Sequence, residues 1–175
     1  MIYNFTLRPN ATWHDGTPVT TDDVIFTLSL VRSQFSSYPD DVRAMWDLVE
    51  ITQLDEKNIK FVLPEPFAPF LDYLTFGVLP KHLLETVPAD QIINNDFNLA
   101  PVGSGPYRFE ELTVAGGEIT GVVLSRNENY FGQAAYIDQI VFRYYPDSAS
   151  AIAAYQDGEV LGISRITPDI LEEAL

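Results

Sequence analysis

The sequence predicts a fold of mixed α/β and α+β character, in which helices flank mixed β-sheets. Three observations support this prediction. An alternating strand pattern at residues 2–8 leads into an apolar helix after Thr20, a strand hairpin is expected over residues 48–63, and three more strands and a helix are expected after residue 107. The apolar content of 46%, with 13% aromatic residues, lets a chain of 175 residues bury a real core.

The charge balance limits the possible partners. Twenty-five acidic residues against ten basic ones give a net charge of −15, which opposes binding to nucleic acids and to anionic membrane surfaces. The same charge either favours cationic ligands or simply keeps the protein soluble. The chain has no cysteine, which excludes disulfides, zinc sites built from thiolates and cysteine nucleophiles. It also has no apolar run of the roughly 20 residues that a membrane-spanning helix requires.

The stretch WHDGTPVTTDDV at residues 13–24 has two interpretations, an acid/base site or a turn followed by a helix. Asp15 and Gly16 are typical of a tight turn. Thr20 with Asp23 three residues later predicts a capping box, and acidic residues in a first helical turn are favoured by the helix dipole. These carboxylates are therefore explained without catalysis, and Trp13 is expected in the core.

Further elements follow from local signals. A helical turn is expected over residues 42–46, and strands are expected over 48–54 and 58–63. Three short helices should follow: one over 70–76, one that begins with Pro80 as its first helical residue, and one over 89–96. The glycines and prolines of residues 100–109 predict a lobe boundary, which divides the chain into residues 1–100 and 101–175. After it we expect strands over 107–112, 119–126, 137–145 and 160–163, a turn at Ala115, Gly116 and Gly117, a helix from Asp147 or Ser148 to Tyr155, and a helix opening at Thr167 and Pro168.

Five motifs in order resemble the family 5 extracellular solute-binding proteins, the peptide- and nickel-binding receptors of ABC importers. They are FTLRPNATWHDGTPVTTDDVIFTLSLV, ITQLDEKNIKFVLPEPFAPFLDYL, LPKHLLE, APVGSGPYRFEEL and LSRNENYFGQAAYIDQIVFRYYPDSASAIAAYQDGEV. One departure stands out, because Leu161 occupies a position where the family usually has an acidic residue. Each motif alone is weakly specific, but their common order and spacing are strongly specific.

The resemblance implies part of a type II periplasmic-binding-protein fold, of the peptide-binding class with an extra small domain. Residues 1–100 would be a lobe I strand with that small domain, and residues 101–175 a return into lobe I. Such proteins are much longer than this chain, which is therefore expected to be an internal fragment without its secretory leader. The parent would be periplasmic or extracellular and membrane-associated. It would capture peptides or similar small solutes and deliver them to an ABC permease, without catalysis and without a cofactor.

The resemblance also implies candidate ligand-binding residues. The segment around Trp46 approaches the cleft in relatives and offers an aromatic side chain, and Phe76 would lie near the cleft wall. Met45 and Tyr38 are further candidates. Ordinary packing in the core is the alternative for all four residues.

The residues give little support for metal binding or catalysis. His14 and His82 lack a partner at metal-ligand spacing, so no metal site is predicted. Ser104 lacks the spacing of a nucleophile elbow. An acidic hydrolase remains an alternative. It would require at least two of the residues His14, Asp15, His82 and Glu110 to share one pocket.

Two further expectations remain open. The fold could have been recruited as a sensor or interaction module, in which case transport is lost. A severed lobe should also expose strand edges and apolar surface, so we expect self-association through the truncated face.

Overall fold

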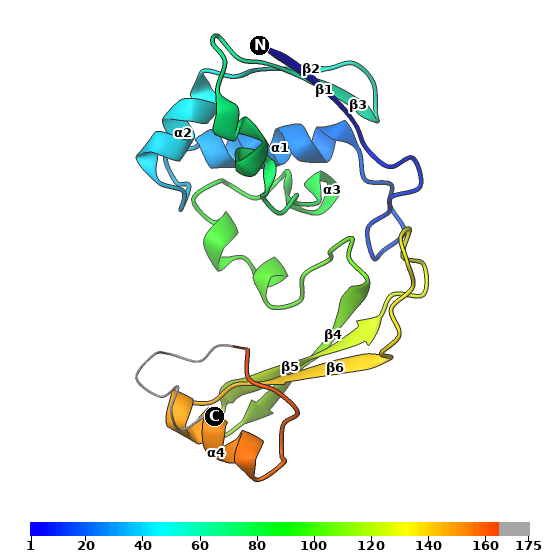
Figure 1. Cartoon of the computed structure of the whole chain (residues 1–175), viewed down its shortest axis with the longest axis vertical. Helices are drawn as coiled ribbons and strands as arrows, with labels where there is room; N and C mark the ends of the chain where they lie inside the picture. Colours follow the sequence, from blue (N-terminus) through cyan, green and yellow to red (C-terminus); the bar gives the residue numbers. More distant parts are fainter. Residues whose placement is uncertain (165–175) are drawn as a thin grey trace. The chain divides into compact units, whose positions relative to one another are not determined.

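The computed structural model describes residues 1–164, which form two compact units (Figure 1). Unit 1 contains residues 1–108 and 127–135, and unit 2 contains residues 109–126 and 136–164. The division falls between Arg108 and Phe109, at the end of the glycine-rich segment at 100–109 and inside a strand. The assignment of the two parts to lobes stays a prediction.

Unit 1 contains a three-stranded antiparallel sheet. Strand β3 (Asn58–Val62) lies in the middle, between β1 (Ile2–Thr6) and β2 (Glu50–Gln53). The hairpin of β2 and β3 confirms the prediction from the sequence, with its turn at Asp55. Ile59 and Phe61 alternate with more exposed residues along β3, so one face of the sheet is buried.

Helices cover the buried face of this sheet. Helix α1 (Thr21–Arg32) and helix α2 (Asp40–Asp47) pack against it together with the 3₁₀ helix η1 (Ala68–Leu74). The largest buried side chains of this core are Leu28, Trp46, Ile59, Phe61 and Phe70. Burying each large aromatic side chain of this kind stabilises the fold by about 2–3 kcal/mol.

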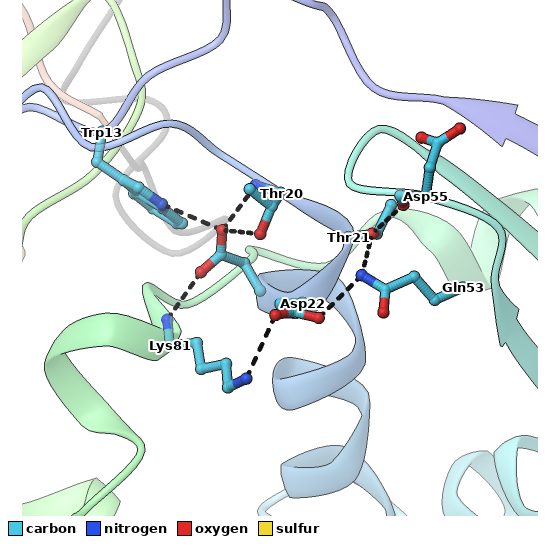
Figure 2. A network of polar contacts seen from close by, with 8 residues as sticks. Trp13, Thr20, Thr21, Asp22, Gln53, Asp55 and Lys81 are labelled. Atoms are coloured by element: carbon cyan, nitrogen blue, oxygen red, sulfur yellow. Dashed lines mark hydrogen bonds and ion pairs between the residues drawn. The ribbon is translucent and has the colours of Figure 1, made fainter.

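The start of α1 shows that residues 13–24 form a turn followed by a helix. The predicted capping box forms, and Asp23 Oδ2 accepts a hydrogen bond from the Thr20 backbone N–H at 2.8 Å. The same carboxylate is only 4% exposed and accepts from Trp13 Nε1 at 3.3 Å and from the Lys81 backbone N–H at 2.9 Å. Figure 2 shows this network, in which the carboxylate joins three segments of unit 1. Trp13 lies in a small buried cluster, as predicted.

A second set of bonds ties the first turn of α1 to the hairpin. Thr21 Oγ1 donates to the Asp55 carbonyl at 2.7 Å, and Gln53 Nε2 donates to Thr21 Oγ1 and to Asp22 Oδ1 (Figure 2). Lys81 Nζ forms an exposed ion pair with Asp22 at 3.4 Å. The helix start is therefore fixed to both sides by side chains that the sequence places in its first turn.

Three predicted helices of unit 1 differ in detail. The segment expected as a helix over residues 70–76 is the 3₁₀ helix η1. The segment over residues 89–96 instead forms two short 3₁₀ turns, η2 (Ile92–Asn94) and η3 (Asp96–Asn98), because Asn95 caps the second turn by accepting from Phe97 N–H at 2.9 Å. Pro80 precedes helix α3 (Lys81–Leu84) as its N-cap, since its ψ of 104° is not helical.

Unit 2 contains a second three-stranded sheet and one helix. Strand β5 (Glu118–Arg126) lies between β4 (Tyr107–Ala115) and β6 (Gln139–Arg143), and β6 runs antiparallel to β5. Helix α4 (Ser148–Gln156) begins after Asp147, whose side chain accepts from Ser150 N–H at 2.8 Å. Gly116 and Gly117 have φ of 63° and 87° in the predicted turn between β4 and β5, a conformation that favours glycine.

One predicted strand of unit 2 is wrong. Residues 160–163 form no strand, and the side chain of Leu161 is 100% exposed. The apolar run indicated a buried strand, but none of the described strands pairs with it. The helix expected to open at Thr167 and Pro168 lies outside the described residues.

Replacing Asp23 should test the network at the start of α1. Asp23→Ala leaves the buried N–H groups of Trp13, Thr20 and Lys81 without this acceptor, so we expect a loss of about 3 kcal/mol in the free energy of unfolding. The measurement is urea unfolding followed by tryptophan fluorescence. Asp22→Ala is the matched control, because Asp22 is exposed and should cost less than about 1 kcal/mol. Equal losses in the two variants would contradict this account.

Candidate functional site

A pocket of about 230 Å³ in unit 1 brings together three of the four predicted ligand-binding residues. It lies between the end of α1, the start of α2 and the segment that follows η1. Its lining consists of Val31, Tyr38, Val42, Trp46, Asp72, Tyr73, Thr75 and Phe76. We call it the aromatic pocket.

Trp46 is the most firmly held side chain of the aromatic pocket. It is 1% exposed, and its ring packs against Phe61 and Phe70 at centroid distances of 6.0 and 5.8 Å. Its carbonyl accepts two hydrogen bonds from the Arg32 guanidinium, at 3.0 and 2.7 Å. Trp46 is therefore a core residue, one edge of which contributes to the pocket wall.

Phe76 and Tyr38 complete the wall on either side. The Phe76 ring is perpendicular to the Trp46 ring, with centroids 5.8 Å apart, which is a favourable edge-to-face arrangement. Tyr38 is 40% exposed and stands just before Pro39, the N-cap of α2. Tyr38 therefore offers an accessible ring at the pocket, whereas Trp46 offers a fixed one.

Met45 does not line the aromatic pocket. It is partly buried against the main core of unit 1. Consecutive residues of an α-helix point about 100° apart, whereas residues four positions apart share a face. Val42 and Trp46 share the face that lines the pocket, and Met45 points to another.

The sequence interpretation missed five of the eight lining residues, among them Asp72 and Tyr73. Asp72 and Tyr73 belong to η1 and line the pocket beside Phe76. Asp72 is the only charged residue in the lining. The three-residue spacing of Tyr73 and Phe76 could have indicated a shared face, but it does not identify the partner of that face.

The two histidines have structural contacts near the first turn. His14 Nδ1 accepts from the Gly103 backbone N–H at 3.1 Å, and His14 Nε2 lies 3.1 Å from the Gly105 carbonyl. His14 is therefore the side chain that ties the GSG segment to the turn at residues 13–17. A Cβ on Gly103 would lie 3.1 Å from His14 Cε1, so a side chain there would be in tight contact with the ring.

The second histidine pairs with an aspartate. His82 Nε2 lies 2.7 Å from Asp15 Oδ2. Partial burial raises the pKa of Asp15, but hydrogen bonds from His82 and Thr17 outweigh it, so the pKa lies below its ordinary value. His82 and Asp15 line neither of the two pockets described, and Glu110 belongs to unit 2. Within residues 1–164 no group of three acidic or histidine side chains could hold a metal ion.

Unit 2 contains a larger hollow of about 1070 Å³. It is lined by β6, the start of α4 and residues 159–164, including the exposed Leu161. The buried hydroxyl of Tyr145 has no hydrogen-bond partner among the described residues. The hollow thus combines exposed apolar side chains with a polar group that folding has left unpaired.

Comparison with models of protein families shows to which family the chain belongs. Residues 1–174 match the model of the bacterial extracellular solute-binding proteins, family 5. The chain belongs to this family. The resemblance inferred from the five motifs is confirmed.

Individual relatives agree with the family. A Brucella ovis protein, described as an ABC transporter peptide-binding protein, is 33% identical over 162 residues, which cover 91% of this chain and 30% of that protein. The oligopeptide-binding protein AppA of Bacillus subtilis, solved with a nonapeptide, matches with a TM-score of 0.77 and 27% identity over 91% of this chain and 31% of AppA. NikZ of Campylobacter jejuni, solved with Ni(L-His), matches with a TM-score of 0.76 and 28% identity, over the same shares of the two chains.

These comparisons confirm the predicted fold, which is part of a type II periplasmic-binding-protein fold with mixed sheets and flanking helices. Members of the family are extracellular or periplasmic solute-binding receptors and not enzymes. The chain spans about 30% of the length of the relatives it matches. In the described part of the chain, no helix has both the length and the apolar character needed to cross a bilayer.

The Asp15 pair predicts a pH-dependent difference in stability. Because the folded-state pKa of Asp15 lies below its ordinary value of 3.8, the ionised carboxylate stabilises the fold above that pH, and the contribution disappears as the pH falls through the folded pKa. We therefore expect Asp15→Asn to lower the urea midpoint at pH 6 and to lower it less at pH 3. Glu85→Gln, an exposed control on the same unit, should show no such pH-dependent difference. An equal loss from Asp15→Asn at both pH values would contradict the assignment.

Proposed function

We propose that the chain is part of a receptor that captures peptides or similar small solutes outside the cytoplasm and delivers them to an ABC permease. The observation that carries this proposal is the family match over residues 1–174. The description of the Brucella ovis relative and the nonapeptide bound to AppA favour peptides as the solute class. The complete protein would be held at the outer face of the membrane that contains the permease.

The mechanism proposed for the complete protein is a shift between open and closed states. Two lobes close around the solute because it binds the closed state better, and the permease recognises closure. Residues 1–100 would supply a strand of the first lobe with the extra small domain, and residues 101–175 would return into the first lobe. No bond of the solute is made or broken in this cycle.

The aromatic pocket is the proposed solute contact within this chain. Tyr38, Trp46 and Phe76 would contribute to binding one end of the solute, and Met45 would support them from the neighbouring face of α2. Trp46 is fixed by the core and by Arg32 and packs against the Phe76 ring, so little conformational entropy is lost when a ligand contacts Phe76. Tyr38 is the accessible member and should contribute to affinity without contributing to the core.

Calorimetric titration tests the proposed function. We expect the product of the complete gene to bind a pool of di- to pentapeptides, and Tyr38→Ala to weaken that binding by about three- to tenfold. Tyr155→Ala, a tyrosine of similar exposure on α4, is the control and should not change the affinity. Titration with Ni²⁺ forms a separate arm, because the NikZ structure contains a nickel complex. Absence of binding in both arms would reject the proposed solute classes.

We further propose that the chain self-associates through the outer edge of β6. Strand β5 lies on one side of β6, and none of the described strands lies on the other. Val141 and Phe142 of this strand and Tyr144 just after it are half-exposed. An unpaired strand edge with apolar side chains is a template for a second copy.

Multi-angle light scattering tests this association. The chain should be a dimer at micromolar concentration, and Val141→Lys should make it monomeric by placing a charge on the pairing strand. Ile93→Lys, at an exposed apolar residue of unit 1, should leave the dimer intact. A folded chain that is strictly monomeric would reject the proposal.

A further inference from the structure

We infer that the aromatic pocket binds an organic cation, namely a positively charged nitrogen that carries aliphatic carbons. Such a group occurs at the end of a lysine side chain and in free methylated amines. The inference rests on the proposed function, because it names the part of the solute that this pocket recognises. It follows from the combination of four aromatic side chains and one carboxylate in a single small pocket.

The aromatic side chains supply the first component of cation binding. Tyr38 precedes α2, Trp46 lies in α2, Tyr73 lies in η1 and Phe76 follows η1, and all four line the same space. The face of an aromatic ring carries partial negative charge, which attracts a cation placed within about 6 Å of it. Phe76 and Trp46 are held perpendicular to each other. Tyr73 is held by an edge-to-face contact with Phe67 at 5.4 Å. Tyr38, Tyr73 and Phe76 therefore offer partly exposed rings to a cation, whereas Trp46, only 1% exposed, holds Phe76 in place.

The carboxylate supplies the second component. Asp72 is the only charged residue that lines the pocket, and none of the hydrogen bonds or ion pairs described here uses its carboxylate. Two cations of neighbouring elements are engaged elsewhere. The Arg32 guanidinium bonds the carbonyls of Trp46 and Val49, and Arg43 bonds the Ser33 carbonyl and Asp40. Arg32 keeps its positive charge beside the Trp46 carbonyl but does not line the pocket, so Asp72 is the charge that a ligand in the pocket would meet.

The size of the pocket limits the ligand. A volume of about 230 Å³ is smaller than the roughly 300–1,000 Å³ of pockets that enclose a drug-sized molecule. It can therefore accept one end of a solute, such as an alkylammonium group, and not a whole peptide. An acidic group of the same size would be opposed by Asp72 and by the faces of the rings. The structure thus favours basic over acidic solutes at this position.

The test compares ligands of equal shape and different charge on the 175-residue chain. Choline chloride and its neutral carbon isostere 3,3-dimethylbutan-1-ol are titrated separately, with backbone amide chemical shifts as the readout. We expect choline to shift the amides of residues 38–46 and 72–76 and to bind at least about tenfold more tightly than the isostere. A second pair, Ala-Lys-Ala and Ala-norleucine-Ala, distinguishes a peptide side chain from a free amine as the source of the cation.

Matched variants separate the pocket from the overall charge. Asp72→Asn should weaken choline binding about three- to tenfold and leave the isostere unchanged. Asp90→Asn removes the same charge from an exposed site outside the pocket and should change neither affinity. Tyr38→Leu should weaken choline binding while Tyr38→Phe, which keeps the ring, should not. Both side chains are accessible, so circular dichroism should show that all variants remain folded.

Two outcomes would overturn the inference. Equal affinity for choline and the isostere would show that the pocket recognises shape and not charge. Absence of binding by all four ligands would show that the pocket is closed to cations. In either case, peptide binding by the product of the complete gene would leave the proposed function standing. Conversely, charge-selective choline binding without any peptide binding would support the pocket and reject peptides as the solute.

Discussion

The buried carboxylate of Asp23 is the group on which the arrangement of unit 1 depends. It accepts hydrogen bonds from Trp13 in the turn before α1, from the N-cap residue Thr20 and from the start of α3. A carboxylate buried to this extent is costly unless its oxygens are paired, so the three segments can only assemble together. The helix that carries the core is thus fixed at its first turn, and its far end is free to form a wall of the aromatic pocket.

Trp46 connects the core of unit 1 to the aromatic pocket. Its ring packs between Phe61 of the sheet and Phe70 of η1, while its carbonyl is held by Arg32 at the end of α1. The same residue therefore belongs to the core and to the pocket wall. A pocket built in this way is formed before a ligand arrives, because the packing that stabilises the fold also fixes the ring that the ligand would meet.

The sequence predicts those features of the fold that depend on neighbouring residues. The capping box at Thr20 and Asp23, the Gly116–Gly117 turn and the cap at Asp147 were all predictable, because each is set within a few positions. The strand expected over residues 160–163 was wrong, since an apolar run cannot show whether a pairing strand is present. The meeting of Asp72 and Tyr73 with α2 was not predictable either, because it is decided by packing between segments about thirty residues apart.

The distribution of charge decides which of two interpretations of the acidic composition applies to the pocket. Acidic residues spread over a surface increase solubility and are screened by salt within about 10 Å at moderate ionic strength. Asp72 differs from them because it stands beside aromatic rings that also carry negative charge on their faces. The negative charge of the Asp72 carboxylate and that of the ring faces act together in a small space from which a ligand would displace water. The same residue type is thus a solubilising group elsewhere on the chain and a determinant of ligand charge in the aromatic pocket.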